Sequence, residues 1–215
     1  MSDADWRPGA NLEALRARAG MLAALRRYFA DAGVLEVETP LACRGAGTDP
    51  ALQPLLTRYR GPVFPDGVDL YLQTSPEFAM KRLLAAGAGA IYQICKSFRD
   101  GEAGHLHNPE FSILEWYRPG FDLERLMAEV ADVVRLALDR PDLEFEVRTY
   151  AELFETGLGV DIFDVPSGQL RALALQQVQG VEGMELSRDG WLDLLLSHLI
   201  EPALPADQLL LLHDF

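Results

Sequence analysis

The side chains best suited to chemistry lie between residues 93 and 117, on two segments whose patterns predict neighbouring β-strands. Alternate residues of a strand share one face. On residues 90–99 that face includes Gln93, Ser97 and Arg99. On residues 109–118 it includes Phe111, Ile113, Glu115 and Tyr117. A sheet face that combines arginine, glutamate and aromatic rings is unusual for a plain core. A buried charge costs several kcal/mol unless it is paired, so these groups should line a cleft or satisfy one another.

These residue types suit the binding of a nucleotide and an amine. The planar fork of an arginine, here Arg99, is well matched to phosphate oxygens. Phe111 offers a ring on which adenine could stack, an interaction worth about 1–3 kcal/mol by analogy with base stacking. A carboxylate and a phenol further along the face, Glu115 and Tyr117, could bind an ammonium group.

A purely structural interpretation stays open at this point. Arg99 and Glu115 could form an ion pair while Phe111 and Tyr117 belong to the core. Residues 75–77, Ser-Pro-Glu, could be no more than a helix start. His107 and Asn108 would then be ordinary turn residues.

The elements around this hairpin indicate an α+β fold. Residues 90–99 and 109–118 predict a long antiparallel hairpin, unlike the strand–helix alternation of a Rossmann sheet. Asn11 can cap a helix that Gly33 ends, and leucines at three- to four-residue steps predict a buried stripe from Leu12 and Leu15 to Leu25 and Phe29. The other expected elements are strands at 34–40, 68–73 and from Gln208 to the end, a loop with short extended pieces at 42–67, and helices from Ser75 to near Gly87 and at 121–140, 149–157, 167–178 and 188–200.

Length and composition indicate one soluble globular domain. The chain has 215 residues, of which 49% are hydrophobic and 24% charged. No segment reaches the roughly 18–20 apolar residues of a membrane span, and the acidic start does not resemble a signal peptide. A net charge of −14 argues against a general nucleic-acid binder. Cys43 and Cys95 are too few for a disulfide framework, so we expect a reducing cytoplasm.

Three ordered blocks carry a resemblance to a known family. Residues 33–40 resemble motif 1 of the class II aminoacyl-tRNA synthetases, and residues 74–77 resemble the amino-acid-binding segment of their lysine subgroup. Residues 98–102, followed by 107–111 and 114–117, resemble motif 2 in its lysine-type form. Ordered blocks at matching separations are more specific than any single short pattern. The resemblance spans roughly residues 11–215 and implies an antiparallel sheet flanked by helices.

Within that subgroup, the chain looks most like the ligases that modify elongation factor P. The core begins near residue 11, which leaves no room before it for the anticodon-binding barrel of lysyl-tRNA synthetases. The sequence Glu-Trp-Tyr-Arg-Pro at 115–119 and Gly101-Glu102 are also closer to the ligases. We therefore expect a short tail at 1–10 and a catalytic domain at 11–215.

The resemblance implies that ATP activates (R)-β-lysine or lysine as an acyl-adenylate, which is then transferred to a lysine side chain of elongation factor P. Arg99 would be catalytic, holding the α-phosphate and stabilising charge there, while Mg²⁺ bridges the phosphates. The other implied ATP-binding residues are Asp100, Gly101, Glu102, His107, Asn108 and Phe111. The implied amino-acid pocket comprises Ser75, Pro76, Glu77, Glu115 and Tyr117. Motif 1 implies a homodimer, and no protein ligand for a metal is implied.

Several positions depart from the family pattern. Gly101 stands where lysyl-tRNA synthetases have a glutamate, so either Glu102 or neither carboxylate meets the adenine amino group. Leu106 replaces an arginine, whose charge His105 could partly supply. Nothing after Tyr117 resembles motif 3, so we expect a domain lacking its C-terminal part, which alone neither activates an amino acid nor binds ATP tightly. The alternatives are an enzyme that charges tRNA and a non-catalytic paralogue that acts as a binding module.

Overall fold

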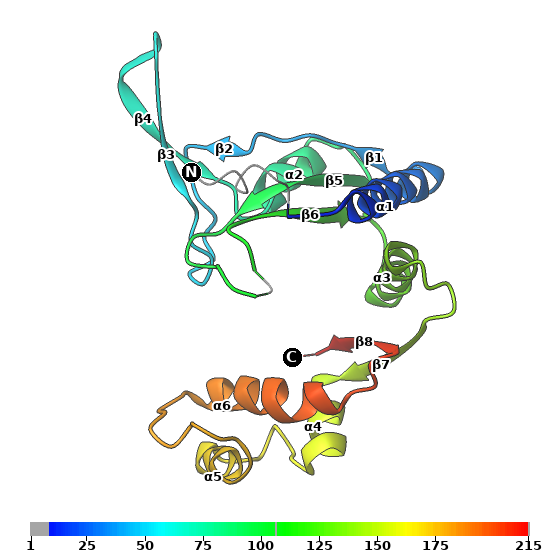
Figure 1. Cartoon of the computed structure of the whole chain (residues 1–215), viewed down its shortest axis with the longest axis vertical. Helices are drawn as coiled ribbons and strands as arrows, with labels where there is room; N and C mark the ends of the chain where they lie inside the picture. Colours follow the sequence, from blue (N-terminus) through cyan, green and yellow to red (C-terminus); the bar gives the residue numbers. More distant parts are fainter. Residues whose placement is uncertain (1–8, 106, 215) are drawn as a thin grey trace. The chain divides into compact units, whose positions relative to one another are not determined.

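The computed structural model describes residues 9–105 and 107–214 (Figure 1). The chain divides between Leu126 and Met127 into two compact units. Most of the expected tail at 1–10, and Leu106, lie outside the described residues. In the described residues no helix is both long and apolar enough to cross a lipid bilayer. Cys43 and Cys95 are both free thiols.

Helix α1 (Leu12–Asp31) begins and ends where its sequence signals place it. The Asn11 side chain accepts a hydrogen bond from the Ala14 N–H at 2.8 Å, which is the bond expected of an N-cap. At the other end Gly33 has a positive φ of 69°, and the N–H groups of residues 33 and 34 bond back to the carbonyls of residues 30 and 29. This closing turn favours glycine because it has no Cβ.

The predicted buried stripe of α1 is wrong in its first two turns. Leu25 and Phe29 are buried, but Leu12 is 70% and Leu15 48% exposed. Periodicity identifies the apolar face of a helix, and it does not say whether another element covers that face. Nothing in the described part of the chain buries these two leucines.

The central sheet of the first unit has the order β1-β5-β6. Strands β5 (Ile91–Phe98) and β6 (Glu110–Tyr117) form the predicted antiparallel hairpin, with Ile91 opposite Tyr117 and Phe98 opposite Glu110. Strand β1 (Leu35–Glu36) pairs with β5 in parallel. It is shorter than the strand predicted at 34–40, and its first residue, Leu35, is 57% exposed.

Tyr92 links β5 to β1 through a hydrogen bond that its hydroxyl donates to the Glu36 carboxylate at 2.9 Å. Burial, and then this bond, raise the pKa of Tyr92 to about 12. Because the pKa is raised in the folded protein, the stability that this phenol contributes should be complete below pH ~10. It should be lost as the pH rises toward the folded value.

Alkaline titration of tyrosine absorbance should therefore show one phenol fewer ionising above pH ~11 in Tyr92→Phe than in the unsubstituted protein. A titration above pH ~11 that is the same in Tyr92→Phe as in the unsubstituted protein would contradict the assignment.

A second sheet, of order β2-β4-β3, comprises the strand predicted at 68–73 and parts of the region predicted to be loop with short extended pieces. Strands β3 (Leu56–Gly61) and β4 (Phe64–Leu72) form an antiparallel hairpin, and β2 (Ala42–Cys43) pairs with the end of β4. The prediction of loop is wrong for β3 and for the start of β4, whereas the strand predicted at 68–73 is confirmed as the second half of β4. Pro62 and Val63 form the turn, and Gly67 is accommodated in β4 at a φ of 85°. Glycine and proline therefore shape this hairpin instead of preventing it.

Helix α2 (Glu77–Ala85) starts one residue later than a Ser75 N-cap would give. Pro76 is the capping residue, and its carbonyl accepts the first helical bond, from Met80, at 2.9 Å. Ser75 still contributes, because its hydroxyl accepts a hydrogen bond from the Glu77 N–H at 3.1 Å. The helix ends before Gly87, as predicted.

Helix α3 (Leu123–Leu138) begins in the first unit and continues into the second, where the predicted helices are found. These are α4 (Tyr150–Leu158), α5 (Ser167–Gln177) and α6 (Arg188–Leu195), the last continued by a π-helical turn at Leu196–Ile200 and a 3₁₀ turn at Glu201–Ala203. The core of this unit includes Phe154, Leu170, Trp191 and Leu195.

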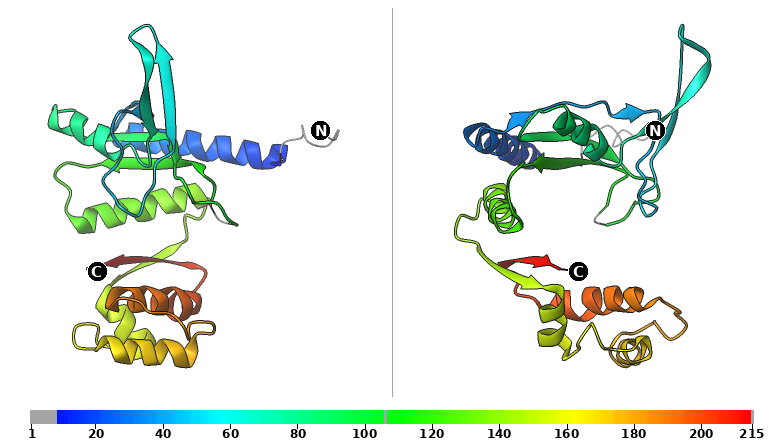
Figure 2. Two further views of the ribbon diagram at one scale, coloured as in Figure 1. Left: turned by 90° about the vertical axis from the view of Figure 1, so that its left-hand side faces the viewer. Right: turned by 180° about the vertical axis from the view of Figure 1, so that it is seen from behind.

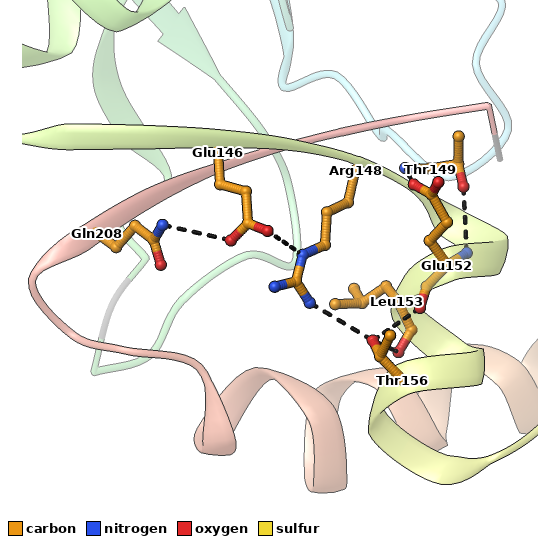
Figure 3. A network of polar contacts seen from close by, with 7 residues as sticks. All are labelled: Glu146, Arg148, Thr149, Glu152, Leu153, Thr156 and Gln208. Carbon is orange, nitrogen blue, oxygen red and sulfur yellow. Dashed lines mark hydrogen bonds and ion pairs between the residues drawn. The ribbon is translucent and has the colours of Figure 1, made fainter.

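A strand that the sequence did not predict completes the second unit. Strand β7 (Glu144–Thr149) pairs in parallel with β8 (Gln208–His213), the strand expected at 208 onward. A polar network follows the two strands into α4 (Figure 3). Arg148 donates to Glu146 at 2.6 Å, and Gln208 donates to the other oxygen of Glu146 at 3.3 Å.

Helix α4 starts with a reciprocal capping box, also drawn in Figure 3. The Glu152 N–H donates to the Thr149 hydroxyl at 3.1 Å, and the Thr149 N–H donates to the Glu152 carboxylate at 2.9 Å. These bonds hold the pKa of Glu152 below its usual value. The contribution of Glu152 to stability should therefore be present at neutral pH and disappear as the pH falls through the lowered pKa.

Replacing Thr149 by alanine should lower the free energy of unfolding by about 1 kcal/mol, the usual cost of losing an N-cap hydroxyl. Urea denaturation followed by circular dichroism measures the change. Thr149→Ser keeps a hydroxyl at the cap and should lose much less. Equal losses in the two variants would show that the hydroxyl does not cap α4.

Candidate active site

The register of β5 and β6 places the predicted chemistry on one face of the sheet. Gln93 is directly opposite Glu115, and Ser97 is directly opposite Phe111. Residues directly opposite one another in an antiparallel pair project from the same side. The face therefore carries Gln93 and Ser97 from β5 beside Phe111 and Glu115 from β6, as the period of two predicted.

Arg99 follows the last paired residue of β5 and lies over Phe111. Its guanidinium carbon is 4.9 Å from the centroid of the Phe111 ring, and one terminal nitrogen is 3.6 Å from the Glu102 carboxylate. The Arg99 N–H donates to the Pro109 carbonyl at 3.0 Å, which fixes the backbone beneath the side chain. The buried Nε of Arg99 has no hydrogen-bond partner in the described part of the chain. The guanidinium of Arg99 therefore has an unused N–H donor with which it can bind an anion.

A second cluster surrounds Glu115. The Ser75 hydroxyl donates to one carboxylate oxygen at 2.7 Å, and the Tyr117 hydroxyl donates to the other at 2.8 Å. Burial, and then the bond to Glu115, raise the pKa of Tyr117 well above its usual value. Tyr117 therefore stays a neutral donor. An ionised carboxylate has about four acceptor sites and uses two here, so Glu115 can still accept from an ammonium group.

This geometry contradicts the ion pair of the purely structural interpretation. Glu115 receives its hydrogen bonds from Ser75 and Tyr117, while the carboxylate beside Arg99 belongs to Glu102. Phe111 and Tyr117 are half-buried instead of fully buried. Both rings remain partly accessible.

The structure does not bring every predicted site residue into these clusters. The Glu77 side chain pairs with Lys81 on the next turn of α2. His107 and Asn108 are exposed in the turn between the strands, where the His107 carbonyl accepts a hydrogen bond from Gly104. Asp100 is exposed as well, and it accepts a hydrogen bond from the Gly101 N–H at 2.9 Å. Pro76 is buried and supports α2.

Two polar residues on the same face were noted in the sequence but not assigned to the site. Gln93 is 1% and Ser97 0% exposed, and neither Gln93 Nε2 nor Ser97 Oγ has a hydrogen-bond partner in the described residues. Thr39 donates to the other end of the Gln93 amide at 3.0 Å. A buried polar atom without a partner costs roughly 1–3 kcal/mol. Gln93 and Ser97 could be identified from the sequence, because each is an even number of positions from Arg99 and therefore shares its face of the strand.

A pocket of about 760 Å³ opens beside the second cluster. It is lined by Ser75 and Glu77, by residues 43–49 after β2 and by residues 71–73 at the end of β4. Its lining does not include Arg99, Phe111 or Glu115. The pocket therefore lies at the edge of the face of β5 and β6 that carries Phe111 and Glu115. The clusters around Arg99 and Glu115 are arranged along that face.

Comparison with known families agrees with the motifs. A family model described as tRNA synthetases class II (D, K and N) matches residues 4–167. The chain belongs to this family. The matched region contains both sheets of the first unit, with the clusters around Arg99 and Glu115. The predicted α+β class II fold is confirmed.

Curated relatives narrow the resemblance within the class II family. A protein of Yersinia pestis (strain Pestoides F), named elongation factor P–(R)-β-lysine ligase, is 45% identical over 217 aligned residues, which cover 100% of this chain and 66% of that relative. A protein of the same name from Enterobacter sp. (strain 638) is 44% identical over 213 residues, covering 99% and 65%. The predicted resemblance to these ligases is confirmed. The chain spans 65–66% of the length of these two relatives.

Proposed function

We propose that the protein uses ATP to activate (R)-β-lysine, or lysine, as an acyl-adenylate and transfers the acyl group to a lysine side chain of elongation factor P. The observation that carries this proposal is the shared face of β5 and β6. A guanidinium lies over a half-buried ring at one end of it, and an oriented carboxylate lies at the other. The names of the relatives supply the substrate and the acceptor.

The proposed reaction has two steps. A carboxylate oxygen of the amino acid attacks the α-phosphorus of ATP, the bond to the β-phosphate breaks, and pyrophosphate leaves. The amine of the acceptor lysine then attacks the acyl carbon, AMP leaves with the electron pair, and the amine loses a proton. Arg99 would stabilise the charge that develops at phosphorus in the first step, which is electrostatic catalysis. It contributes no covalent chemistry.

The nucleotide would lie along the end of the face nearest the turn between the strands. Adenine would stack on Phe111, and residues 99–102 with His107 and Asn108 would border the phosphates. The described residues contain no cluster of three His, Cys, Asp or Glu side chains able to hold a metal ion. Mg²⁺ suits this arrangement, because it commonly binds through substrate phosphates with only one or two protein carboxylates.

The amino acid would lie further along the same face, with an ammonium group at Glu115. Phe111 and Glu115 are four positions apart on β6, which corresponds to about 13 Å at the rise of a strand. An extended acyl-adenylate can bridge such a separation. Ser75 and Tyr117 would hold the carboxylate in place while it accepts the ammonium group, and Pro76 and Glu77 would border the pocket.

We also propose that the protein forms a homodimer through the region of residues 33–40 and acts in the cytoplasm. An exposed apolar side chain in that region supports the dimer, because Leu35 is 57% exposed. The proposed acceptor, elongation factor P, takes part in translation, and this supports a location in the cytoplasm.

Mass spectrometry of elongation factor P tests the proposed function. The acceptor is incubated with ATP, Mg²⁺, (R)-β-lysine and the protein expressed from its complete reading frame. We expect a mass increase of one lysyl group, located on a lysine side chain, that requires ATP. Isotope exchange between ATP and pyrophosphate, dependent on the amino acid, reports the first step separately. An unmodified acceptor under conditions that modify it with one of the relatives would refute the proposal.

A further inference from the structure

The hairpin formed by β3 and β4, residues 56–72, extends away from the β1-β5-β6 sheet (Figures 1 and 2). It is called the hairpin arm below. Its apolar side chains are unusually open to solvent, with Leu56 62%, Tyr59 49% and Val63 79% exposed. Strand β3 is the last strand of its sheet, so its outer edge has no strand beside it in the described residues. Exposed apolar groups next to an open edge mark an interaction surface.

Two arginines, Arg58 and Arg60, lie on one side of the arm. Gly67, with a φ of 85°, leaves space that a Cβ would fill, because such an atom would lie 2.7 Å from Arg58 and 3.2 Å from Arg60. Arg58 is held by the Asp69 carboxylate at 3.2 Å and the Asp66 carbonyl at 2.8 Å. No described residue forms an ion pair or hydrogen bond with Arg60. The fork of Arg60 can therefore bind a carboxylate of another molecule.

The opposite side of the arm is aromatic. The rings of Tyr59 and Phe64 meet edge to face with centroids 6.4 Å apart, and the Arg44 guanidinium lies 4.7 Å above Phe64. Tyrosine, phenylalanine and arginine are enriched at protein interfaces. The arm contains two arginines and two aspartates, so it lacks the positive charge that a nucleic acid would require.

Both ends of the arm are fastened beside the candidate active site. Before β3, the Gln53 carbonyl accepts a hydrogen bond from the N–H of Asp100, next to Arg99, at 2.7 Å. After β4, the Gln73 carbonyl accepts from the Phe98 N–H at 2.9 Å, and the Gln73 side chain donates to the Lys96 carbonyl at 2.9 Å. Residue 73 then leads directly into Ser75, which holds Glu115. A molecule that extends from the turn to the base of the arm therefore reaches the groups assigned to both substrates.

We propose that the hairpin arm is the docking surface for the protein acceptor, elongation factor P. The acceptor contacts the exposed apolar side chains near the turn and offers a carboxylate to Arg60, so that its target lysine reaches the acyl-adenylate. This inference rests on the proposed function, because it assigns a place to the acceptor of that reaction. It does not require the arm to take part in the formation of the adenylate.

Two substitutions test the arm without disturbing the fold. Val63→Asp and Arg60→Glu change exposed side chains that form no ion pair or hydrogen bond with a described residue. Phe163→Asp is the matched control, since Phe163 is 80% exposed but lies in the second unit. For each variant of the protein expressed from its complete reading frame, one measures amino-acid-dependent ATP–pyrophosphate exchange, the KM for elongation factor P, binding of the acceptor by calorimetry, and molar mass by light scattering.

Each arm substitution should raise the KM and the Kd for elongation factor P about tenfold or more, as expected on losing an interface anchor, while exchange and the control stay unchanged. Unchanged acceptor binding in both arm variants would overturn the docking inference even if exchange and transfer are normal. A lower molar mass with unchanged acceptor binding would overturn it too, because a second copy would then occupy the arm. Absence of exchange in the unsubstituted protein would count against the proposed function alone, since calorimetry still tests docking.

Discussion

Replacing Arg99 by alanine should lower the rate of amino-acid-dependent ATP–pyrophosphate exchange by about 10²–10³-fold, the loss typical of removing one charge-stabilising donor. The fork lies over Phe111 and its buried Nε has no partner in the described residues, so it is available to the α-phosphate. Arg99→Lys keeps the charge and loses the planar fork. It should recover only part of the rate.

A second arginine provides the control for this experiment. Arg125 lies 4.0 Å above the ring of Phe121, so Arg125→Ala removes the same kind of cation–π contact away from the proposed site. Exchange should be unchanged in that variant. Equal losses in Arg99→Ala and Arg125→Ala, or none in either, would show that Arg99 does not act on the nucleotide.

Replacing Glu115 by glutamine should raise the KM for the amino acid about 30-fold or more, the low end of the cost of truncating a buried charge pair. The substitution keeps the size of the side chain and removes the charge that would face the ammonium group. The KM for ATP should change little, because Phe111 and Arg99 lie further along the sheet. Exchange rates measured across amino-acid concentrations separate the two constants.

Glu110→Gln is the matched control for Glu115→Gln. Glu110 is on the same strand, but it faces solvent and pairs with Lys96 at 2.9 Å. Its substitution should leave both KM values unchanged. If the two variants behave alike, the carboxylate of Glu115 does not recognise the amino acid.

The sequence predicted the face of the β5–β6 hairpin correctly because the information was local. Alternation along each strand decides which side chains share a face, and the two strands follow one another in the chain, separated by residues 99–109. The proposed ion pair between Arg99 and Glu115 was wrong because alternation does not give the distance between two residues along the face. Arg99 is six positions from Gln93, the residue opposite Glu115, or about 20 Å at the rise of a strand. That separation prevents the ion pair, and Glu102 lies beside Arg99 instead.

Strand β7, which the sequence missed, depends on pairing between distant segments. In β7, Phe145 and Val147 alternate with glutamates, yet the strand exists because β8 pairs with it some sixty residues later. In the hairpin arm, the glycines and prolines suggested loop, while the structure uses them for the turn and for the close approach at Gly67. In α1, the apolar face was evident, but its exposure at Leu12 and Leu15 was not.

The candidate site was predictable only in part, because the contacts of its side chains depend on how the elements pack together. The resemblance assigned Ser75 and Tyr117 to the amino acid, and both contact Glu115. Gln93 and Ser97 were visible as neighbours on the face, but their lack of hydrogen-bond partners is a property of packing. The roles of His107 and Asn108 remain predictions, because both are exposed in a turn.

A crystal structure of the protein from its complete reading frame, with a non-hydrolysable acyl-adenylate analogue bound, tests the central claim most directly. We expect the adenine on Phe111, the phosphate mimic within hydrogen-bond distance of the Arg99 fork, and the ammonium group at Glu115. An analogue bound away from this face of β5 and β6 would contradict the account. So would an analogue with its ammonium group directed toward another part of the chain.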